Sequence, residues 1–413
     1  MRILFLGVNY SPEVTGIGHF TAGVAEHFAD LGHQVTAVTK YPHYPQWRVA
    51  PEHLRLGTTR EQLHDVDVVR LKTYIPSKKA AVGRIRYDTS FAVRAWWYSK
   101  ELPFQDLLIA VSPPVQLALV GRWLARQWGS TTTILRIHDL PTDLAEAVGL
   151  MRPGVPLWMA QRFEQRMYRK STSMVVVSEG IRQRLLHYGV PDDRISVIPV
   201  WTTIDPSASN SPKAALDYLG LPPGSRVVLH AGNLGEKQGV AALVEAFLAR
   251  NDLGDTYLIL VGDGTERSTI QALLASNSTN RVRLIPLLPQ DLYASMLAAA
   301  EILLLKQRPA VTDSVAPGKL LAYMAAGKAV VAAIARTSES ARQIQTAGCG
   351  YIVDPTNMSE LLDLLVALRQ NGTELAAMGA RGRVAVDQFR REVVLGAWDE
   401  LLVELIARRK SKR

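Results

Sequence analysis

The sequence predicts two α/β domains in tandem, each built on a doubly wound parallel sheet. A strand-helix-strand pattern opens the chain, apolar runs of strand length alternate with helical periodicity, and the same order begins again near the middle. The 413 residues suffice for two or three domains. A content of 47% hydrophobic and 21% charged residues excludes a disordered, fibrous or coiled-coil protein.

The first half predicts a strand, a glycine loop, a helix and a second strand. The apolar run Arg2–Val8 predicts a buried strand, and Gly16 and Gly18 lie in the loop after it. Apolar residues then recur at helical spacing until Gly32, and Gln34–Thr39 begins the second strand. Further strands are predicted at Val66–Lys72, Leu107–Val111, Thr132–Ile137, Met174–Val177 and Ile195–Val200.

Composition changes in the segment Val200–Arg226, where prolines and serines predict an interdomain connection. We therefore expect an N-terminal domain of residues 1–205, a C-terminal domain of residues 206–389, and a last helix in residues 390–413 that packs back on the first domain. In open α/β folds, ligands bind at the carboxyl ends of the strands. The second domain has predicted strands at Val227–Ala231, Tyr257–Val261, Val282–Pro286, Ile302–Leu305, Ala329–Ala333 and Gly350–Val353.

The net charge indicates which ligands the protein could bind, and the cysteine content indicates in which cellular compartment it could work. Forty-seven Lys and Arg against 38 Asp and Glu give a net charge of +9 and a pI near 9.6, which favours nucleic acid, lipid head groups or phosphorylated metabolites. Cys349 is the only cysteine, so a disulfide within the chain is excluded. The sequence has neither a membrane-spanning apolar stretch nor a signal-peptide pattern, and we expect a cytoplasmic protein.

A glycine-rich loop follows the first predicted strand of the second half. It runs Gly232-Asn233-Leu234-Gly235-Glu236-Lys237-Gln238-Gly239, so that Lys237 lies in a strand-to-helix loop. A cation placed there could neutralise a diphosphate. The loop is not a P-loop because no Gly-Lys-Ser/Thr follows, and a solvated loop lysine is the structural alternative.

Two other segments have glycines at a predicted helix start. Gly16 and Gly18 precede the first helix, where a backbone can approach an anionic ligand. Pro317-Gly318-Lys319 opens another helix, and the backbone N–H groups of Gly318, Lys319 and Leu320 are candidates for a phosphate. An ordinary turn and an ordinary helix start are the alternatives.

Acidic and histidine residues give one candidate site in the first half. His138 and Asp139 follow the predicted strand Thr132–Ile137, where a histidine can orient a hydroxyl group or share a proton. The alternative is a histidine satisfied by the backbone. Asp65 and Asp67 form an Asp-x-Asp pattern at the start of a predicted strand, and we expect no metal and no cofactor.

Between Arg70 and Lys100 eight basic residues alternate with aromatic ones. This mixture suits a surface that rests on an anionic membrane and receives a lipid-linked acceptor. Nucleic-acid binding and an ordinary charged helix with its aromatics in the core are the alternatives. The candidate surface residues are Lys78, Lys79, Arg84, Arg86, Trp96 and Trp97.

The motifs together resemble a known family. NYSPEVTGIGHFT, YPHYPQW, GNLGEKQG and PGK-LLAYMAAGKAVVAA are similar to motifs of the retaining glycosyltransferases of family 4, and most similar to the subgroup of colanic acid and related exopolysaccharide enzymes. The resemblance covers residues 2 to about 389. It implies a GT-B fold, that is, two Rossmann-like domains facing across a cleft.

The resemblance also implies roles for individual residues. It places Gly16 and Gly18 beside the donor diphosphate and sugar, and His138 beside the donor sugar. It places Lys237 with Gly232 and Asn233 in the diphosphate loop. The helix start Gly318–Leu320 would help to hold the diphosphate, and family members need no metal.

The chain departs from the family pattern at several positions. Asn233 stands where the loop usually has arginine. The family's two glutamates would fall at Ser314 and Ala322, and Asp313 is the candidate substitute for the first.

The resemblance predicts hexosyl transfer from a nucleotide diphosphate sugar, with retention, to an acceptor that is polyprenyl-diphosphate-linked or another glycan. The expected setting is exopolysaccharide or cell-envelope glycan synthesis on the inner face of the cell membrane. Nucleic acid is not an expected partner. A non-catalytic sugar-nucleotide-binding protein and a nucleotide-sugar epimerase are the alternatives.

Overall fold

The computed structural model describes residues 1–13, 16–43, 47–76, 81–147, 149–205, 211–222, 224–310 and 318–410. They form two compact units. The first takes in the chain up to Val200 together with the last helix from Glu392, and the second takes in most of the chain between Trp201 and Arg391. Each unit is a parallel sheet with helices between its strands, which confirms the predicted fold class.

The first unit contains an eight-stranded sheet in the order β3-β4-β2-β1-β5-β6-β7-β8. Apart from β3, which runs antiparallel to β4, all neighbouring strands are parallel. The edge strand β3 was missed in the sequence because its residues TREQL are polar and largely exposed. The strands are β1 (Arg2–Leu6), β2 (Gln34–Lys40), β3 (Thr59–Leu63), β4 (Val66–Leu71), β5 (Leu107–Ser112), β6 (Thr132–Ile137), β7 (Met174–Val176) and β8 (Ile195–Val197).

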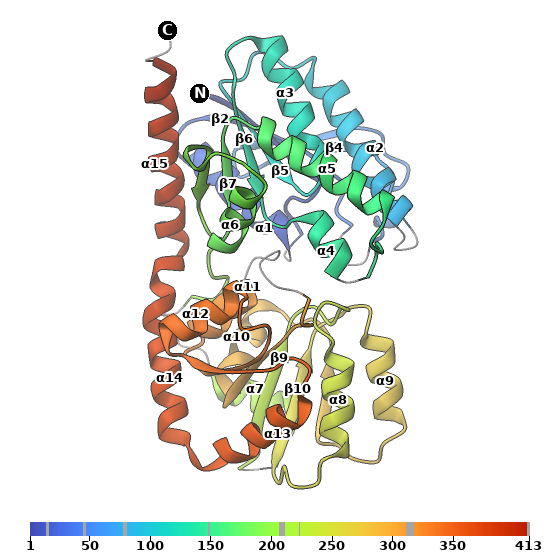
Figure 1. The fold of residues 1–413 in the computed structure, drawn as a ribbon, viewed down its shortest axis with the longest axis vertical. Helices are drawn as coiled ribbons and strands as arrows, with labels where there is room; N and C mark the ends of the chain where they lie inside the picture. The colour runs from blue at the N-terminus through green and yellow to red at the C-terminus, as the bar shows by residue number, and fades with distance from the viewer. Residues whose placement is uncertain are drawn as a thin grey trace. The chain divides into compact units, whose positions relative to one another are not determined.

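Helices cover both faces of this sheet. In the first unit α2, α3 and α5 lie side by side (Figure 1). Right-handed crossovers place them on one face and α1 on the other. β1 and β5 are apolar except for Arg2 and Ser112 at their ends, and every position but Arg2 is buried, as expected for central strands covered on both sides. The helices are α1 (Ile17–Asp30), α2 (Ala81–Ser99), α3 (Gln116–Trp128), α4 (Pro141–Ala147), α5 (Val155–Lys170) and α6 (Glu179–His187).

The second unit contains a six-stranded parallel sheet in the order β11-β10-β9-β12-β13-β14. Leucine and valine side chains of β9, β10 and β12 pack with α8 and α13 in its core. The strands are β9 (Arg226–Ala231), β10 (Thr256–Val261), β11 (Val282–Ile285), β12 (Ile302–Lys306), β13 (Ala329–Ala333) and β14 (Gly350–Val353). The helices are α7 (Pro212–Leu219), α8 (Val240–Ala249), α9 (Arg267–Ala275), α10 (Gln290–Ala299), α11 (Gly318–Ala325), α12 (Glu339–Ala347), α13 (Met358–Ala367) and α14 (Gly372–Ala385).

Two segments differ from the sequence prediction by more than one or two residues. The segment Val200–Arg226 is not only a connection, because it contains α7, which packs on α10. Proline at the first helical position and Gly220 after the last explain why a proline-rich segment forms a helix there. The strand predicted at Ile195–Val200 ends at Val197.

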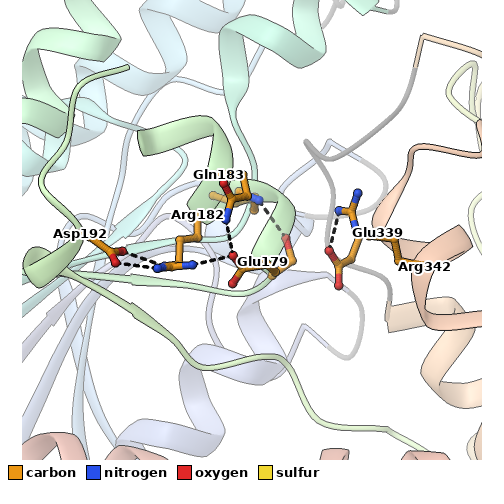
Figure 2. A network of polar contacts seen from close by, with 8 residues as sticks. Glu179, Arg182, Gln183, Asp192, Glu339 and Arg342 are labelled. Carbon is orange, nitrogen blue, oxygen red and sulfur yellow. Dashed lines mark hydrogen bonds and ion pairs between the residues drawn. The ribbon is translucent and has the colours of Figure 1, made fainter. Parts of the chain in front are cut away.

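Two helices begin with the same local pattern, Ser-Glu-x-x-Arg-Gln, at residues 178–183 and 338–343. In each, the serine side chain accepts a backbone N–H at 3.3 Å and the arginine pairs with the glutamate (Figure 2). Arg182 also makes two hydrogen bonds to Asp192, of 2.7 and 2.9 Å. A carboxylate in the first turn offsets the helix dipole, so this pattern stabilises the starts of α6 and α12.

The last helix, α15 (Arg391–Lys410), packs on the first unit. Its buried residues Val394, Leu395, Trp398, Leu401 and Leu402 recur at helical spacing. The Trp398 ring packs edge-on against Phe28 with 6.2 Å between centroids, and the Arg136 guanidinium lies 5.0 Å from it. His27 Nε2 lies 2.8 Å from Asp399 Oδ1.

Trp398 should be the main anchor of α15, since it is buried to 1% exposure. Replacing it by alanine leaves a cavity beside Phe28, and we expect a loss of about 3–5 kcal/mol of unfolding free energy. Urea unfolding followed by circular dichroism measures this. Val403→Ala, at a position of α15 that is 67% exposed, is the control. Equal stabilities of the two variants would contradict the anchoring role.

Candidate functional site

The topology of the second unit defines where a ligand would bind. From β9 the chain proceeds to β10 and β11 on one side, and from β12 to β13 and β14 on the other. The order therefore reverses between β9 and β12, and ligands of open α/β sheets bind at the carboxyl ends of the strands at such a point. The glycine-rich loop begins there, at Gly232.

The loop is held by close backbone contact between the turns that end β9 and β10. Gly232 and Gly262 have φ angles of 126° and 146°, and a Cβ atom at Gly262 would overlap the carbonyl oxygen of Gly232. Gly232 N donates to Val261 O at 2.8 Å, and Leu234 N donates to Asp263 O at 2.9 Å. The positive φ angles favour glycine at both positions, so the loop that begins at Gly232 and the segment Gly262-Asp263-Gly264 form one structure.

Lys319 is the lysine that contacts this turn. It lies in the first turn of α11, and its Cε atom is 2.8 Å from the place of a Cβ atom at Gly232. Its Nζ atom lies 3.1 Å from Nε2 of His230, a completely buried residue of β9. Burial lowers the pKa of Lys319 to about 7, and burial together with this neighbouring amine lowers the pKa of His230 well below its usual range.

Tyr323 ties α11 to the same point of the sheet. Its hydroxyl group accepts a hydrogen bond from Ala231 N at 2.9 Å and lies 3.2 Å from Ala231 O and 3.4 Å from Leu304 O. β9 and β12 pair only at Ile302 and Leu303. The tyrosine hydroxyl therefore satisfies backbone groups where these two strands separate.

Lys237, predicted to neutralise a diphosphate, is partly buried and makes no side-chain hydrogen bond or ion pair within the described chain. Its carbonyl oxygen accepts from Arg308 N at 2.8 Å. The N-terminus of α8, immediately after the loop, is already satisfied, because a Glu266 oxygen accepts from Val240 N at 2.6 Å and Ala241 N at 3.2 Å. The role of Lys237 stays a prediction.

The other residues of this unit that were predicted to bind the donor do not all lie at the glycine turns. Gly318 and Leu320 lie with Lys319 in the first turn of α11, and Leu320 is buried. Asn233 is exposed, and its side chain lies against the loop glycine Gly235. Asp313 and Ser314 lie outside the described residues. Ala322, at the second position where the family has glutamate, is buried in α11.

In the first unit the strand order reverses between β1 and β5. Gly16 precedes α1 with a φ angle of 75°, and Gly18 packs against the backbone of Tyr10, which lies 3.0 Å from where a Cβ atom would be. Glu13 is buried beside them. Its oxygens accept from Asn9 Nδ2 at 2.7 Å and from His43 N at 2.9 Å.

The sequence did not predict a role for Glu13 or the buried polar cluster around it. His43 Nδ1 lies 2.8 Å from Tyr41 O, and its Nε2 lies 2.7 Å from the Tyr87 hydroxyl. Burial lowers the pKa of His43, so the ring is neutral and Nε2 accepts from Tyr87. Lys40 Nζ lies 3.2 Å from the centre of the Tyr87 ring, and burial lowers its pKa to about 6. The motifs NYSPE and YPHYPQW were the available signal, since both follow central strands.

His138 follows β6 and is 2% exposed. Its Nε2 atom is buried and has no hydrogen-bond partner in the part of the chain that the structure describes, and its ring stacks on Phe20 at 6.5 Å. Burial, with a contribution from Arg136, lowers its pKa well below the usual range. A neutral imidazole with a free ring nitrogen is a suitable partner for a ligand hydroxyl group.

The predicted acceptor and membrane surface divides between inward and outward residues. Arg84 pairs with Asp88 at 3.3 Å, Arg86 lies over Tyr74, and Trp96 is half-buried. Trp97 is 62% exposed. Lys78 and Lys79 lie outside the described residues. Arg70, at the start of the basic segment, is buried and paired with Glu61, so its assignment to a charged surface was wrong.

The outward side of α2 has an apolar groove of about 830 Å³. Val82, Ile85 and Val93 line it and are all more than half exposed, while Arg86 and Arg94 also line it. Among the described residues, no helix is long and apolar enough to cross a membrane, and no group of acids, histidines or cysteines could hold a metal ion. Asp65 lies in the turn between β3 and β4, and Asp67 lies on β4.

Solved structures show which fold this is. Sucrose-phosphate synthase from Thermosynechococcus elongatus superposes with a TM-score of 0.73 at 18% identity, covering 98% of this chain and 99% of that one. Anabaena Alr3699/HepE in complex with UDP-glucose superposes with a TM-score of 0.69 at 15% identity, covering 98% and 100%. The fold is that of the GT-B glycosyltransferases.

Sequence comparisons give the family. Residues 15–201 match the glycosyl transferase 4-like domain, and residues 225–371 match the glycosyl transferases group 1 domain. The chain is 29% identical over 373 residues to WcaI of Escherichia coli K12, whose name is putative colanic acid biosynthesis glycosyl transferase. The match covers 88% of this chain and 90% of WcaI. The chain belongs to the family 4 glycosyltransferases, as its motifs predicted.

We expect Glu13 to hold together the two loops after β1 and β2. Glu13→Ala leaves the His43 backbone N–H and the Asn9 amide without their acceptor and should cost about 1–3 kcal/mol of unfolding free energy. Glu13→Gln keeps one oxygen acceptor and should cost less. Chemical denaturation of both variants measures the difference, and equal losses would contradict the hydrogen-bonding role.

Proposed function

We propose that this chain is a retaining hexosyltransferase that uses a nucleotide diphosphate sugar and acts on a lipid-linked saccharide acceptor in exopolysaccharide or cell-envelope glycan synthesis. The observation that carries the proposal is the glycine turn at the β9/β12 switch point, with Lys319 against Gly232. An anionic diphosphate fits this combination of open backbone and amine. The structural neighbour HepE was solved with UDP-glucose, and WcaI is named for polysaccharide synthesis.

The proposed reaction is same-face substitution without a metal. The acceptor oxygen bonds to the anomeric carbon, the bond from that carbon to the diphosphate oxygen breaks, and the leaving diphosphate takes the acceptor proton. Lys237, Lys319 and the start of α11 would stabilise the leaving group, and Gly16 and Gly18 would let the backbone approach the donor. His138 would orient the sugar through its unpartnered Nε2 atom.

A non-catalytic sugar-nucleotide-binding protein is the second candidate. The buried alanine at position 322 favours it, because the glutamate that family members use at this position is missing. It predicts donor binding without release of nucleoside diphosphate.

A donor screen separates the two candidates. Purified protein is incubated with UDP-, GDP- and dTDP-sugars and a membrane lipid extract, and free nucleoside diphosphate is measured. We expect release from one donor that depends on the extract and falls roughly 10²-fold in Lys237→Ala and in His138→Ala. Lys213→Ala, at an exposed lysine of α7, is the control. Binding of a donor without release would replace the enzymatic proposal by the second candidate.

We further propose that the apolar groove on α2 contacts the anionic inner face of the cell membrane. Trp97 and Val93 are exposed and apolar, and Arg86 and Arg94 supply positive charge beside them.

Vesicle flotation at low salt tests this surface. The double variant Trp97→Ser, Val93→Ser should reduce the fraction bound to phosphatidylglycerol vesicles at least fivefold. Val384→Ser, at a 73% exposed valine of α14, should not. Wild-type protein that stays entirely in the bottom fraction, away from the floated vesicles, would contradict membrane binding.

A further inference from the structure

The hydrogen-bond directions around Lys319 follow from the carbonyl group of Leu304. His230 Nδ1 lies 3.0 Å from Leu304 O, and a carbonyl oxygen only accepts, so Nδ1 carries the ring proton. Nε2 therefore has a lone pair, and Lys319 Nζ donates to it at 3.1 Å. An uncharged histidine thus holds the amine at the turn and neither repels nor neutralises a positive charge on it.

Among the described residues, the groups that act on this pair bring no negative charge. His230 comes from β9, Lys306 from β12 acts on His230, and Tyr323 lies on the same helix as Lys319, with Tyr293 of α10 behind it. Within the described chain, Lys319 has no ion pair with a carboxylate. A protonated Lys319 is therefore a partly buried cation without a counterion, which is unfavourable until an anion arrives.

We propose that Lys319 is a charge switch at the donor site, whose amine takes up a proton when a diphosphate binds over Gly232, and that His230 positions this amine. This inference rests on the proposed function, because the ligand is the donor diphosphate. Asn233 is uncharged at the position where family members usually have arginine. In this proposal Lys319 supplies the positive charge instead.

Two further observations support the assignment. The Lys319 stem occupies the space that a side chain at position 232 would need, so the glycine both exposes the backbone and admits the lysine. Burial lowers the pKa of Lys319 to about 7, and the two negative charges of a bound diphosphate would raise it again. Binding must then take up a proton wherever the free amine is neutral.

Calorimetry in buffers of different ionisation enthalpy measures this uptake. The probes are UDP-glucose and GDP-mannose, whose esterified diphosphates keep the same charge from pH 6 to pH 8. We expect uptake to rise from near zero at pH 6 to nearly one proton at pH 8, and donor affinity to fall by up to about tenfold between pH 7 and pH 8. Lys319→Met should remove both the uptake and the pH dependence.

The matched control is Lys328→Met. Lys328 directly precedes the amino end of β13, whereas the glycine turns lie at the carboxyl ends of the strands. Burial also lowers the pKa of Lys328. This variant should keep the proton uptake of the wild type.

The positioning role of His230 is tested with a pair of variants. His230→Leu removes the acceptor and should weaken donor affinity about tenfold, while His230→Gln offers an amide oxygen to Lys319 and should stay within about threefold of the wild type. A merely structural role would lower the Tm of the variants and leave the proton uptake unchanged.

The outcomes separate this inference from the function on which it rests. Donor binding without proton uptake, or uptake that persists in Lys319→Met, overturns the charge switch and leaves the transferase proposal standing. Failure of both probes to bind at any pH, with no nucleoside diphosphate released in the donor screen, overturns both.

Discussion

The glycine turns of the second unit depend on one backbone contact, that between Gly232 and Gly262 at the ends of β9 and β10. A Cβ atom at Gly262 would overlap the Gly232 carbonyl oxygen, and a Cβ atom at Gly232 would lie 2.8 Å from Lys319 Cε. The contact turns the following loop back so that Leu234 N reaches Asp263 O. Because Gly232 has no side chain, the Lys319 side chain of α11 occupies the space beside it.

The sequence predicted the fold well because strands buried on both faces have a simple pattern. β6, β13 and β14 have the predicted bounds, and the other central strands differ by one or two residues. The polar edge strand β3 lacked that pattern. Of the site, the glycine turns were found because glycine is a local signal. The partnership of His230 with Lys319 was not, because it joins residues 89 positions apart through the order of the strands.

The first unit shows the same limit in a different form. Glu13 and His43 belong to two motifs that the sequence analysis quoted only for their resemblance, and each motif alone contains an ordinary polar residue. The parallel pairing of β1 with β2 brings both loops to one edge of the sheet, where Glu13 accepts from the His43 backbone. Their contact follows from topology and not from local propensity.

The missing glutamates change the electrostatics of the proposed donor site as well as its hydrogen bonds. Among the described residues near the glycine turns, Glu266 is the acid that faces the α8 N-terminus, and its oxygens are engaged by the backbone and by Arg308 at 3.7 Å. Lys237 and Lys319 make no ion pair with a carboxylate of the described chain, whereas Lys306 is buried and donates to Pro355 O at 2.9 Å. A leaving diphosphate needs positive charge more than it needs a carboxylate, and a carboxylate beside the turn would keep Lys319 protonated before the donor arrives. Alanine at position 322 is therefore compatible with leaving-group stabilisation, and its cost would fall on the placement of the nucleotide instead.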